Sequence, residues 1–405
     1  MDGAPLWRNR DFVLLQSGQL LSTFGSGLSA IAYPLLALVL TGSAAKTGYV
    51  GAVELAPIVL LSFVAGLAAD RLDRRRLMIG ADVLGATAVS VLAVAVLTHH
   101  ATFWLVMVVA FADTTASVVF RAGNSGAFKA VVPTAQLADA SSVMAARAST
   151  VRLTAPPVGG ALFGLAQGVP FLVDAVSYAF STGALLLMRT PFQEQREPGA
   201  RVRLSEGLTY FWRIPFLRVT IGMIAASNIA AAGVPVAIIV LAHRRGLSSA
   251  AIGILIAALG VTTLAGSLLS PLLRRVLPMR VVLLSEFWSA LIYAAFIAYP
   301  SVYVLVAALA VQAFWFPNTD SAMSAYSYSL IPDRLLGRAM AASHTLRALA
   351  VPIGPLAAGL LLTYTSPRTA IALLVAPVVI AAALGTASSA LRDVPSLSAT
   401  APEDT

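Results

Sequence analysis

Five charged side chains lie within long apolar stretches of the sequence, where a charge could do chemistry. They are two acids and three arginines: Glu54, Asp113, Arg147, Arg152 and Arg347. A charge at membrane depth is costly unless it faces a partner, water or a transported ion. A carboxylate in a low-dielectric site holds its proton tightly, whereas a nearby arginine favours the charged form, so an acid beside a movable cation can take up and release a proton. We expect Asp113 to be this acid, with Glu54 as the second candidate and the arginines as the cations.

The same residues also admit a purely structural interpretation. An acid and an arginine could form a static ion pair that holds two helices together. Three further acids, Asp82, Asp174 and Glu286, fall near the ends of their apolar stretches, and for them the structural role is favoured. The four histidines are scattered and the chain has no cysteine, so no metal-ligand spacing can be found. We expect neither a metal nor a cofactor.

The composition predicts an integral membrane protein. Of the 405 residues, 58% are hydrophobic and 11% are charged, whereas soluble domains carry about 25% charged residues. A helix needs about 20 apolar residues to cross a bilayer core of about 30 Å. Twelve stretches meet this length, near residues 13–40, 48–69, 77–98, 101–121, 141–165, 168–189, 218–242, 248–272, 280–300, 301–322, 340–363 and 369–391. The predicted fold class is therefore an all-α polytopic membrane protein.

The twelve predicted helices fall into two halves of six. The expected parts are an N-terminal half over 1–189, a cytoplasmic linker over 190–217, a C-terminal half over 218–391 and a cytoplasmic tail over 392–405. The halves repeat at a shift of 199 residues, which places Pro156 on Pro355 and Gly160 on Gly359. Parallel repeats of this kind are typical of transporters that bind substrate near the bilayer midplane.

Basic residues predict the orientation of the chain. With the N-terminus inside, the outside segments hold only Lys46, Arg244, Arg245 and Arg368, and most of the other basic residues fall in inside segments. Cytoplasmic loops carry an excess of Lys and Arg. We therefore expect a multi-pass protein of the inner (plasma) membrane with both termini in the cytoplasm. The net charge of +9 then reflects topology, and no nucleic-acid partner is expected.

A charge-dense loop separates the second and third predicted helices. It runs from Gly66 to Met78 and reads GLAADRLDRRRLM. This spacing resembles the loop between the second and third helices of the major facilitator superfamily, whose motif reads Gly-x-Leu-Ala-Asp-Arg-x-Gly-Arg-Lys-x-x-Leu. The matching charged and glycine positions are Gly66, Asp70, Arg71, Arg74 and, in place of lysine, Arg75. The resemblance implies the superfamily fold and a latch that acts when the cavity faces outward.

A second motif lies in the fifth predicted helix. Residues 154–160 read TAPPVGG, which resembles the Gly-Pro-x-x-Gly-Gly motif of exporters in this superfamily. Pro156, Gly159 and Gly160 match it, Ala155 replaces the first glycine, and Pro355 and Gly359 belong to its copy in the other half. The resemblance implies antiport. Small residues are also common wherever membrane helices pack closely, which explains the pattern equally well.

The resemblance further implies that the first, fourth, seventh and tenth helices line a central cavity. On those helices, besides Asp113, lie Gln19, Asn228, Gln312, Trp315 and Phe316. They would offer hydrogen bonds and flat apolar surface to a small molecule. Trp315 and Phe316 could equally well face lipid.

The resemblance covers the whole chain and is strongest to the enterobactin-exporter and macrolide-efflux branch. It rests there on RNRDF at residues 8–12, the fifth-helix motif, and FLVDA at residues 171–175. It implies a secondary transporter that exports a small amphipathic molecule, such as a drug, an antibiotic or a siderophore, by proton antiport. The partners would be substrate, protons and the bilayer, without a nucleotide, since the sequence has no phosphate-binding loop. An importer of the same superfamily, or a membrane receptor or assembly factor that does not transport, stays open, whereas an enzyme is not expected.

Overall fold

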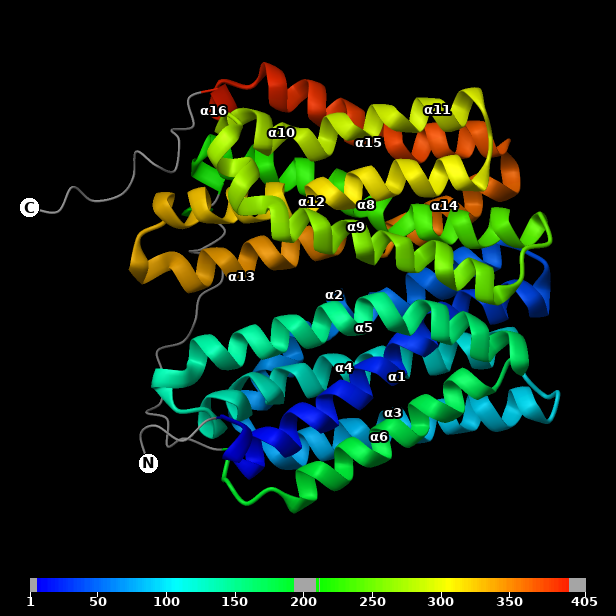
Figure 1. Ribbon diagram of the computed structural model, residues 1–405, viewed down its shortest axis with the longest axis vertical. Coiled ribbons are helices and arrows are strands. Elements are labelled where there is room, and N and C mark those ends of the chain that lie inside the picture. The colour runs from blue at the N-terminus through cyan, green and yellow to red at the C-terminus, as the bar shows by residue number, and fades with distance from the viewer. Residues whose placement is uncertain (1–5, 193–208, 211, 393–405) are drawn as a thin grey trace, which may run out of the picture. The chain divides into compact units, whose positions relative to one another are not determined.

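In the computed structural model, residues 6–192, 209–210 and 212–392 are described, and these residues contain helices but no β-strand (Figure 1). The helices of the N-terminal part are η1 (Leu6–Arg8), α1 (Arg10–Thr41), α2 (Ala44–Arg71), α3 (Arg74–Leu97), α4 (Phe103–Val131), η2 (Thr134–Gln136), α5 (Leu137–Leu165) and α6 (Val169–Leu187). Those of the C-terminal part are α8 (Pro215–Arg244), α9 (Ser249–Val276), α10 (Met279–Ser289), η3 (Ala290–Ile292), α11 (Tyr293–Ala298), α12 (Val302–Leu330), α13 (Asp333–Leu349), α14 (Ile353–Tyr364), α15 (Pro367–Ala387) and α16 (Ser389–Arg392).

The chain divides into two compact units. The first contains Met1–Pro198 together with Ala242–Ala257, and the second contains Gly199–Leu241 together with Ala258–Thr405. Of the linker predicted over 190–217, residues 193–208 and 211 lie outside the described part of the chain. The same is true of residues 393–405 in the predicted tail. The predicted boundaries of linker and tail therefore stay predictions.

Eleven of the described helical segments are long and apolar enough to cross a membrane. One of them joins α10, η3 and α11, and another joins part of α13 to α14. The one predicted span that is not among these eleven is the fifth, over 141–165, which corresponds to α5 and is 29 residues long. It is less apolar than the others because Ala, Gly, Pro, Ser and Thr make up most of it. The prediction of an all-α polytopic fold is confirmed.

Several helices are longer than hydropathy predicts. The fourth span was expected to end near residue 121 and the tenth near 322, yet α4 continues to Val131 and α12 to Leu330. Each of these helices has 29 residues, or about 43 Å at 1.5 Å per residue, which exceeds a bilayer core of about 30 Å. Hydropathy falls where a helix leaves the hydrocarbon, but its backbone hydrogen bonds continue beyond that point.

Two spans predicted as single helices are interrupted. Between α13 and α14, Pro352 lacks a backbone N–H, and Val351 and Ile353 instead donate to Ala348 and Ala350 in tight turns. The other interruption is the 3-10 turn η3 between α10 and α11, which contains no proline.

Within the first unit, α1 packs along α6, while α3 packs on α4 and α6, and α2 packs on α4. Small residues make the contact between α1 and α6 close. A Cβ added to Gly18 would lie 3.2 Å from the Cβ of Ala184. One added to Gly25 would lie 2.9 Å from the Cα of Asp174. Gly18 and Gly25 therefore belong to a helix-packing surface of α1.

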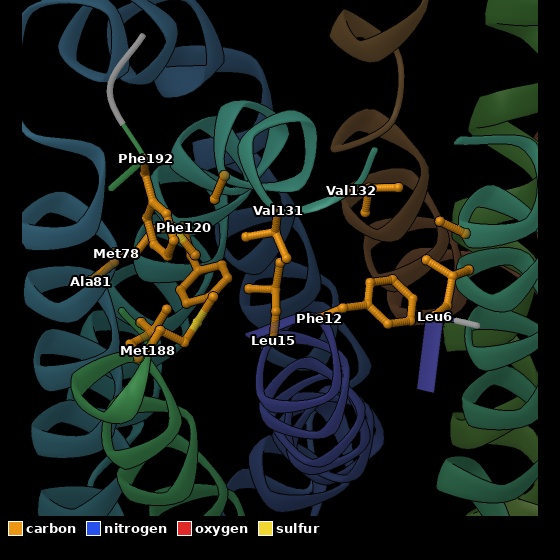
Figure 2. Packing of buried hydrophobic residues seen from close by; sticks show 13 residues of the cluster. Leu6, Phe12, Leu15, Met78, Ala81, Phe120, Val131, Val132, Met188 and Phe192 are labelled. Carbon is orange, nitrogen blue, oxygen red and sulfur yellow. The ribbon is translucent and has the colours of Figure 1, made fainter. Parts of the chain in front are cut away.

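An apolar cluster lies at the end of the first unit where α2 joins α3. Figure 2 shows Phe120 of α4 near Met188 and Phe192, which follow α6, and Leu15 of α1 beside Val131 of α4. All of these side chains are buried. The cluster joins the ends of α1, α3, α4 and α6 into one core.

Polar contacts fasten the start of the chain to the same end. The Asn9 side chain accepts a hydrogen bond from Phe12 N, which caps α1, and donates to the carbonyl of Val131 at 2.9 Å. Asp11 Oδ2 accepts from the backbone N–H of Thr190 at 2.7 Å and from that of Arg189 at 3.1 Å. The RNRDF segment thus ties the beginning of α1 to the ends of α4 and α6.

Candidate functional site

Asp113 lies at the centre of a buried polar network in the first unit. Asp113 is 4% exposed and is the eleventh residue of α4. Tyr33 of α1 donates to Asp113 Oδ2 at 2.9 Å, and Tyr178 of α6 donates to Oδ1 at 2.6 Å. The carboxyl group is therefore held by two phenol hydroxyls from two different helices.

A second acid, Asp174 of α6, is buried in the same network. It is completely unexposed. Ser29 of α1 donates to its Oδ2 at 2.6 Å, and Ser177 donates to its Oδ1 at 3.2 Å. Gly25 leaves the room for these groups, because its added Cβ would meet the Ser177 hydroxyl and would lie 2.6 Å from Asp174 Oδ1.

The Tyr178 hydroxyl connects the network to side chains at its edge. Besides donating to Asp113, it lies 3.2 Å from the hydroxyl of Ser26 and 3.4 Å from that of Ser117. Both serines are partly exposed. The ring itself is enclosed, since a Cβ added to Gly85 of α3 would lie 2.7 Å from the Tyr178 Cζ. A glycine on α3 is therefore required for the position of this tyrosine.

The expected arginine partner of Asp113 is not what the structure shows. Within the described residues of the first unit, no arginine forms an ion pair with Asp113, and its hydrogen bonds come from tyrosines. Arg147 instead donates to Gln16 Oε1 at 2.8 Å, and Arg152 is exposed. In the second unit, Arg347 pairs with Asp320 at 3.3 Å. In this structure tyrosine hydroxyls on α1 and α6 occupy the two oxygens of Asp113, and pairing of Asp113 with an arginine during transport stays a prediction.

The remaining acids also differ from expectation. Glu54 of α2 is partly buried and interacts electrostatically with Asp113. Asp82 of α3 is unexposed, and Ser181 of α6 faces it, but neither of its oxygens has a hydrogen-bond partner within the described residues. Glu286 of α10 is 3% exposed and accepts from the hydroxyl of Ser227. For Asp82 and Glu286, position near a span end suggested a structural ion pair, but helix packing buries each of them beside a serine hydroxyl. The coupling role of Glu54 stays a prediction.

The predicted cavity residues of the second unit form hydrogen bonds within that unit. Gln312 is 3% exposed and accepts from Tyr293 at 3.0 Å, and Asn228 donates to the Arg347 carbonyl at 2.9 Å. Trp315 stacks edge-on with Phe314 at 5.4 Å, and Phe316 is 38% exposed. In the first unit, Gln19 is buried. Whether these residues contact a substrate stays a prediction.

The repeat gives Asp113 a neutral counterpart. The shift of 199 residues that relates the halves places Asp113 of α4 on Gln312 of α12. Each accepts a hydrogen bond from a buried tyrosine, Tyr33 or Tyr178 for Asp113 and Tyr293 for Gln312. The position thus carries a titratable group in one half and an amide in the other.

The loop between α2 and α3 ties the helices of the first unit together at one end. Asp73 caps α3 by accepting from Arg76 N at 2.8 Å. Arg75 donates to the carbonyls of Leu186 and Met188 at 2.8 and 2.7 Å, where α6 ends. Arg74 donates to the carbonyl of Phe192 at 3.2 Å. Two predicted motif residues, Arg74 and Arg75, thus form hydrogen bonds with the chain at and after the end of α6.

The other residues of this motif are placed differently. The side chains of Asp70 and Arg71 are exposed. Gly66 has no atom within 4 Å of an added Cβ, so helix packing does not require a glycine there. The conformational role of these three residues stays a prediction.

The fifth-helix motif lies where α5 and α1 pack closely. An added Cβ on Gly27 of α1 would lie 2.7 Å from the Ala155 Cβ, and one on Gly159 would lie 3.1 Å from the Leu28 Cα. In the second unit, a Cβ on Gly233 of α8 would lie 2.6 Å from the carbonyl of Gly354, which is the repeat equivalent of Ala155.

The remaining residues of the motif and its copy are also enclosed. A Cβ added to Gly160 would meet the carbonyl oxygen of Ser249. Pro355 and Gly359 are buried, and Pro156 is partly buried. The packing explanation for the motif is therefore supported by the structure, and its role in antiport stays a prediction.

Sequence reasoning missed Asp174, Tyr178 and Tyr33. A usable signal was present, because Gly25 and Ser29 on α1 are four residues apart and so lie on one helix face. Asp174 and Tyr178 on α6 show the same spacing. Within the described residues, no three His, Cys, Asp or Glu side chains cluster as the ligands of a metal ion would.

The sequence matches the family described as transmembrane secretion effectors over residues 3–403. It is 26% identical over 223 residues to the multidrug efflux pump Tap of Mycobacterium tuberculosis, covering 52% of this chain and 53% of that protein. It is 23% identical over 211 residues to macrolide efflux protein A of Streptococcus pyogenes, covering 49% of this chain and 52% of that protein. The chain thus spans about half the length of the curated relatives it matches.

Solved structures share the fold over almost the whole chain. A bacterial homologue of the iron transporter ferroportin gives a TM-score of 0.74 at 18% identity, covering 95% of this chain and 99% of that one. A bacterial homologue of the lysosomal transporter spinster gives a TM-score of 0.73 at 16% identity, covering 96% and 98%. The chain belongs to the transmembrane secretion effector family and has the fold of the major facilitator superfamily.

Proposed function

We propose that this protein is a secondary transporter that exports a small amphipathic organic molecule from the cytoplasm in exchange for protons. Family membership and relatives named as a multidrug efflux pump and a macrolide efflux protein support export. Fold likeness alone would not, because one fold hosts many functions. Within this proposal, the two predicted six-helix halves over 1–189 and 218–391 are the moving parts, and both termini are cytoplasmic.

The observation that carries proton coupling is the environment of Asp113. An acid buried in a membrane helix is costly and marks an ion or proton pathway more often than a packing contact. Asp113 is 4% exposed and is held by Tyr33 and Tyr178 rather than by an arginine. A hydroxyl can donate to a carboxylate or accept from a carboxylic acid. Such partners let the acid gain or lose a proton without leaving an uncompensated cation behind.

Coupling then requires that the proton affinity of Asp113 differ between the two transport states. A ligand shifts a conformational equilibrium only by as much as its affinities for the two states differ. The two tyrosines come from α1 and α6, so a shift of α1 against α6 would change how many hydroxyls reach Asp113. Substrate and proton would compete through this change.

The proposal is tested with Asp113→Asn in inverted membrane vesicles. Ethidium and the macrolide erythromycin serve as probes, and an inside-acid pH gradient is imposed. Wild-type vesicles should accumulate a probe, whereas the variant should lose the gradient-driven part while it still exchanges the probe down its own gradient. Asp139→Asn is the matched control, because Asp139 is an exposed acid at the start of α5 in the same unit.

Four outcomes decide between the candidates. Undiminished accumulation by Asp113→Asn would remove Asp113 as the coupling residue. Accumulation by wild type that ignores the gradient would contradict proton antiport. Uptake of probe in the opposite direction would indicate an importer, and probe binding without any flux would favour a receptor.

A further inference from the structure

The first unit encloses two acids in one hydrogen-bonded network, although the proposed function uses only one of them. Asp113 and Asp174 are 4% and 0% exposed. They come from α4 and α6, and each interacts electrostatically with the other and with Tyr33. Although Asp174 lies close to the start of α6, it is fully buried, and Ser29 and Ser177 donate hydrogen bonds to its oxygens.

A chain of hydroxyl groups connects the two acids. Tyr178 donates to Asp113 Oδ1 at 2.6 Å, and its oxygen lies 3.2 Å from the Ser26 hydroxyl. Ser26 in turn interacts with the Asp174 carboxyl group. Tyr178 and Ser26 therefore lie between the two acids, and the last step to Asp174 needs a rotation of the Ser26 hydroxyl, because within the described residues Ser26 forms its hydrogen bond with Tyr178.

The charged groups around this pair do not neutralise two negative charges. From the neighbouring helices, α2 contributes Glu54, which faces Asp113, and α3 contributes Asp82, which faces Ser181 of α6. The cation nearest to the network on α4 is Arg121, which is exposed and acts on Tyr178. It lies eight residues from Asp113, or about 12 Å along the helix. Within the described residues, α1 and α5 direct no charged side chain at either acid.

Two carboxylates in one apolar site cannot both ionise at little cost, so such a pair shares a proton. We propose that Asp174 is a second proton-carrying residue, and that it shares one proton with Asp113 through Tyr178 and Ser26. This inference rests on the proposed function in assigning the shared proton to transport. It deepens that proposal by making the coupling group a pair of acids on α4 and α6.

The transfer balances without any other reactant. The protonated Asp113 gives its proton to the Tyr178 oxygen, Tyr178 gives its own proton to the Ser26 oxygen, and Ser26 gives its own to Asp174. Each hydroxyl ends with one proton, as it began, and the negative charge moves from Asp174 to Asp113. A shift of α1 that separates Ser26 from Tyr178 would break the route and leave the proton on one acid.

Infrared spectroscopy of the purified protein in lipid tests the sharing without any transported molecule. The carbonyl stretching band of protonated carboxyl groups is followed against pH for wild type, Asp113→Asn and Asp174→Asn. If the acids share a proton, removing Asp174 removes the repulsion from its charge. The band that remains from Asp113 should then disappear about 1 to 3 pH units lower than in wild type.

Two further variants separate coupling from loss of structure. Ser26→Ala and Tyr178→Phe break the route but keep both acids, and they should bring the two separated titration steps of the coupled pair closer together. Tyr293→Phe is the control, because it removes the equivalent hydroxyl beside Gln312 in the other half and should leave the band unchanged. An Asp113 band that titrates identically in wild type, Asp174→Asn and Ser26→Ala would overturn the proposal.

Failure of the proposed function gives a different result. The purified protein can also be tested for transport in liposomes. A pH gradient that drives no ethidium movement by wild type would refute antiport of that probe. The infrared titration would still decide whether the two acids share a proton. A normal gradient-driven flux combined with independent titrations would keep Asp113 as the coupling residue and reject Asp174.

Discussion

Single residues decide how an acid can be kept at membrane depth. A buried ion pair would hold Asp113 in its charged form, because protonation would leave the arginine unpaired. Two tyrosine hydroxyls impose no such preference, since a hydroxyl can both donate and accept. Glycines make this arrangement sterically possible: Gly25 admits Asp174 and Gly85 admits Tyr178. The chemistry of the site thus depends on residues that carry no chemistry themselves.

Gly25→Ala should therefore destabilise the first unit. Its Cβ would meet the Ser177 hydroxyl and lie 2.9 Å from the Asp174 Cα, and overpacking of this kind costs about 1 to 3 kcal/mol. We expect a lower melting temperature of the purified protein in detergent. Gly183→Ala on α6 is the control, since its Cβ would have no atom within 4 Å and alanine favours a helix. Equal melting temperatures for the two variants would mean that α1 and α6 can move apart freely.

At the scale of elements, the loop between α2 and α3 holds helix ends as well as topology. Arg75 reaches from the start of α3 to two carbonyls at the end of α6. The last carbonyls of a helix have no partner within it, so an arginine there replaces hydrogen bonds that water would otherwise supply. The basic run thus fastens the start of α3 to the end of α6.

Arg75→Ala should loosen the end of α6. Two hydrogen bonds to a charged donor would be lost, each of which contributes about 1.5 to 3 kcal/mol where it is shielded from water and less at this partly exposed site. Hydrogen exchange followed by mass spectrometry should show faster exchange at residues 185–190. Arg76→Ala removes the same charge from an exposed position whose side chain makes no such contacts with the described residues. If both variants exchange alike, the loop only anchors the topology.

Much of the element order could be predicted from sequence because a bilayer imposes a length on each apolar segment. The position of Asp174 could not, since hydropathy gives only its distance from a span end and not the helices that surround it. Tyr33 and Tyr178 were missed for a related reason: in helices that are apolar on all sides, periodicity does not show which face is inside. Matching the polar faces of α1 and α6 would have found the network.

At the scale of the whole molecule, the distribution of basic residues predicts the orientation in the membrane. Lys46 lies at the start of α2, 5.4 Å from the ring of Phe103 at the start of α4. Arg74 and Arg75 lie at the start of α3, just after the other end of α2. We expect a cysteine placed at position 46 to react with an impermeant thiol reagent in intact cells. One placed at position 73 should react only after permeabilisation, and the reverse pattern would invert the topology.

Asp70→Asn and Arg71→Ala should slow transport by changing the balance between the two transport states. Both side chains are exposed, so neither change should disturb the core, and expression and insertion should be near normal. The probe affinity measured at equilibrium should change little while the turnover falls. Turnover equal to wild type in both variants would show that the motif has no conformational role.

The weakly apolar character of α5 has a consequence for how the protein is made. Most residues of α5 are Ala, Gly, Pro, Ser and Thr, and the helix also carries Arg147 and Arg152. The transfer of such a segment by itself from the translocon into lipid releases little free energy. Gly159 and Ala155 of this segment fit against α1, which is synthesised earlier. We infer that α5 enters the bilayer by docking onto α1 rather than by partitioning on its own. The close fit between these helices would then serve biogenesis first, and changes at Gly27 or Gly159 would lower the yield of inserted protein before they altered any flux.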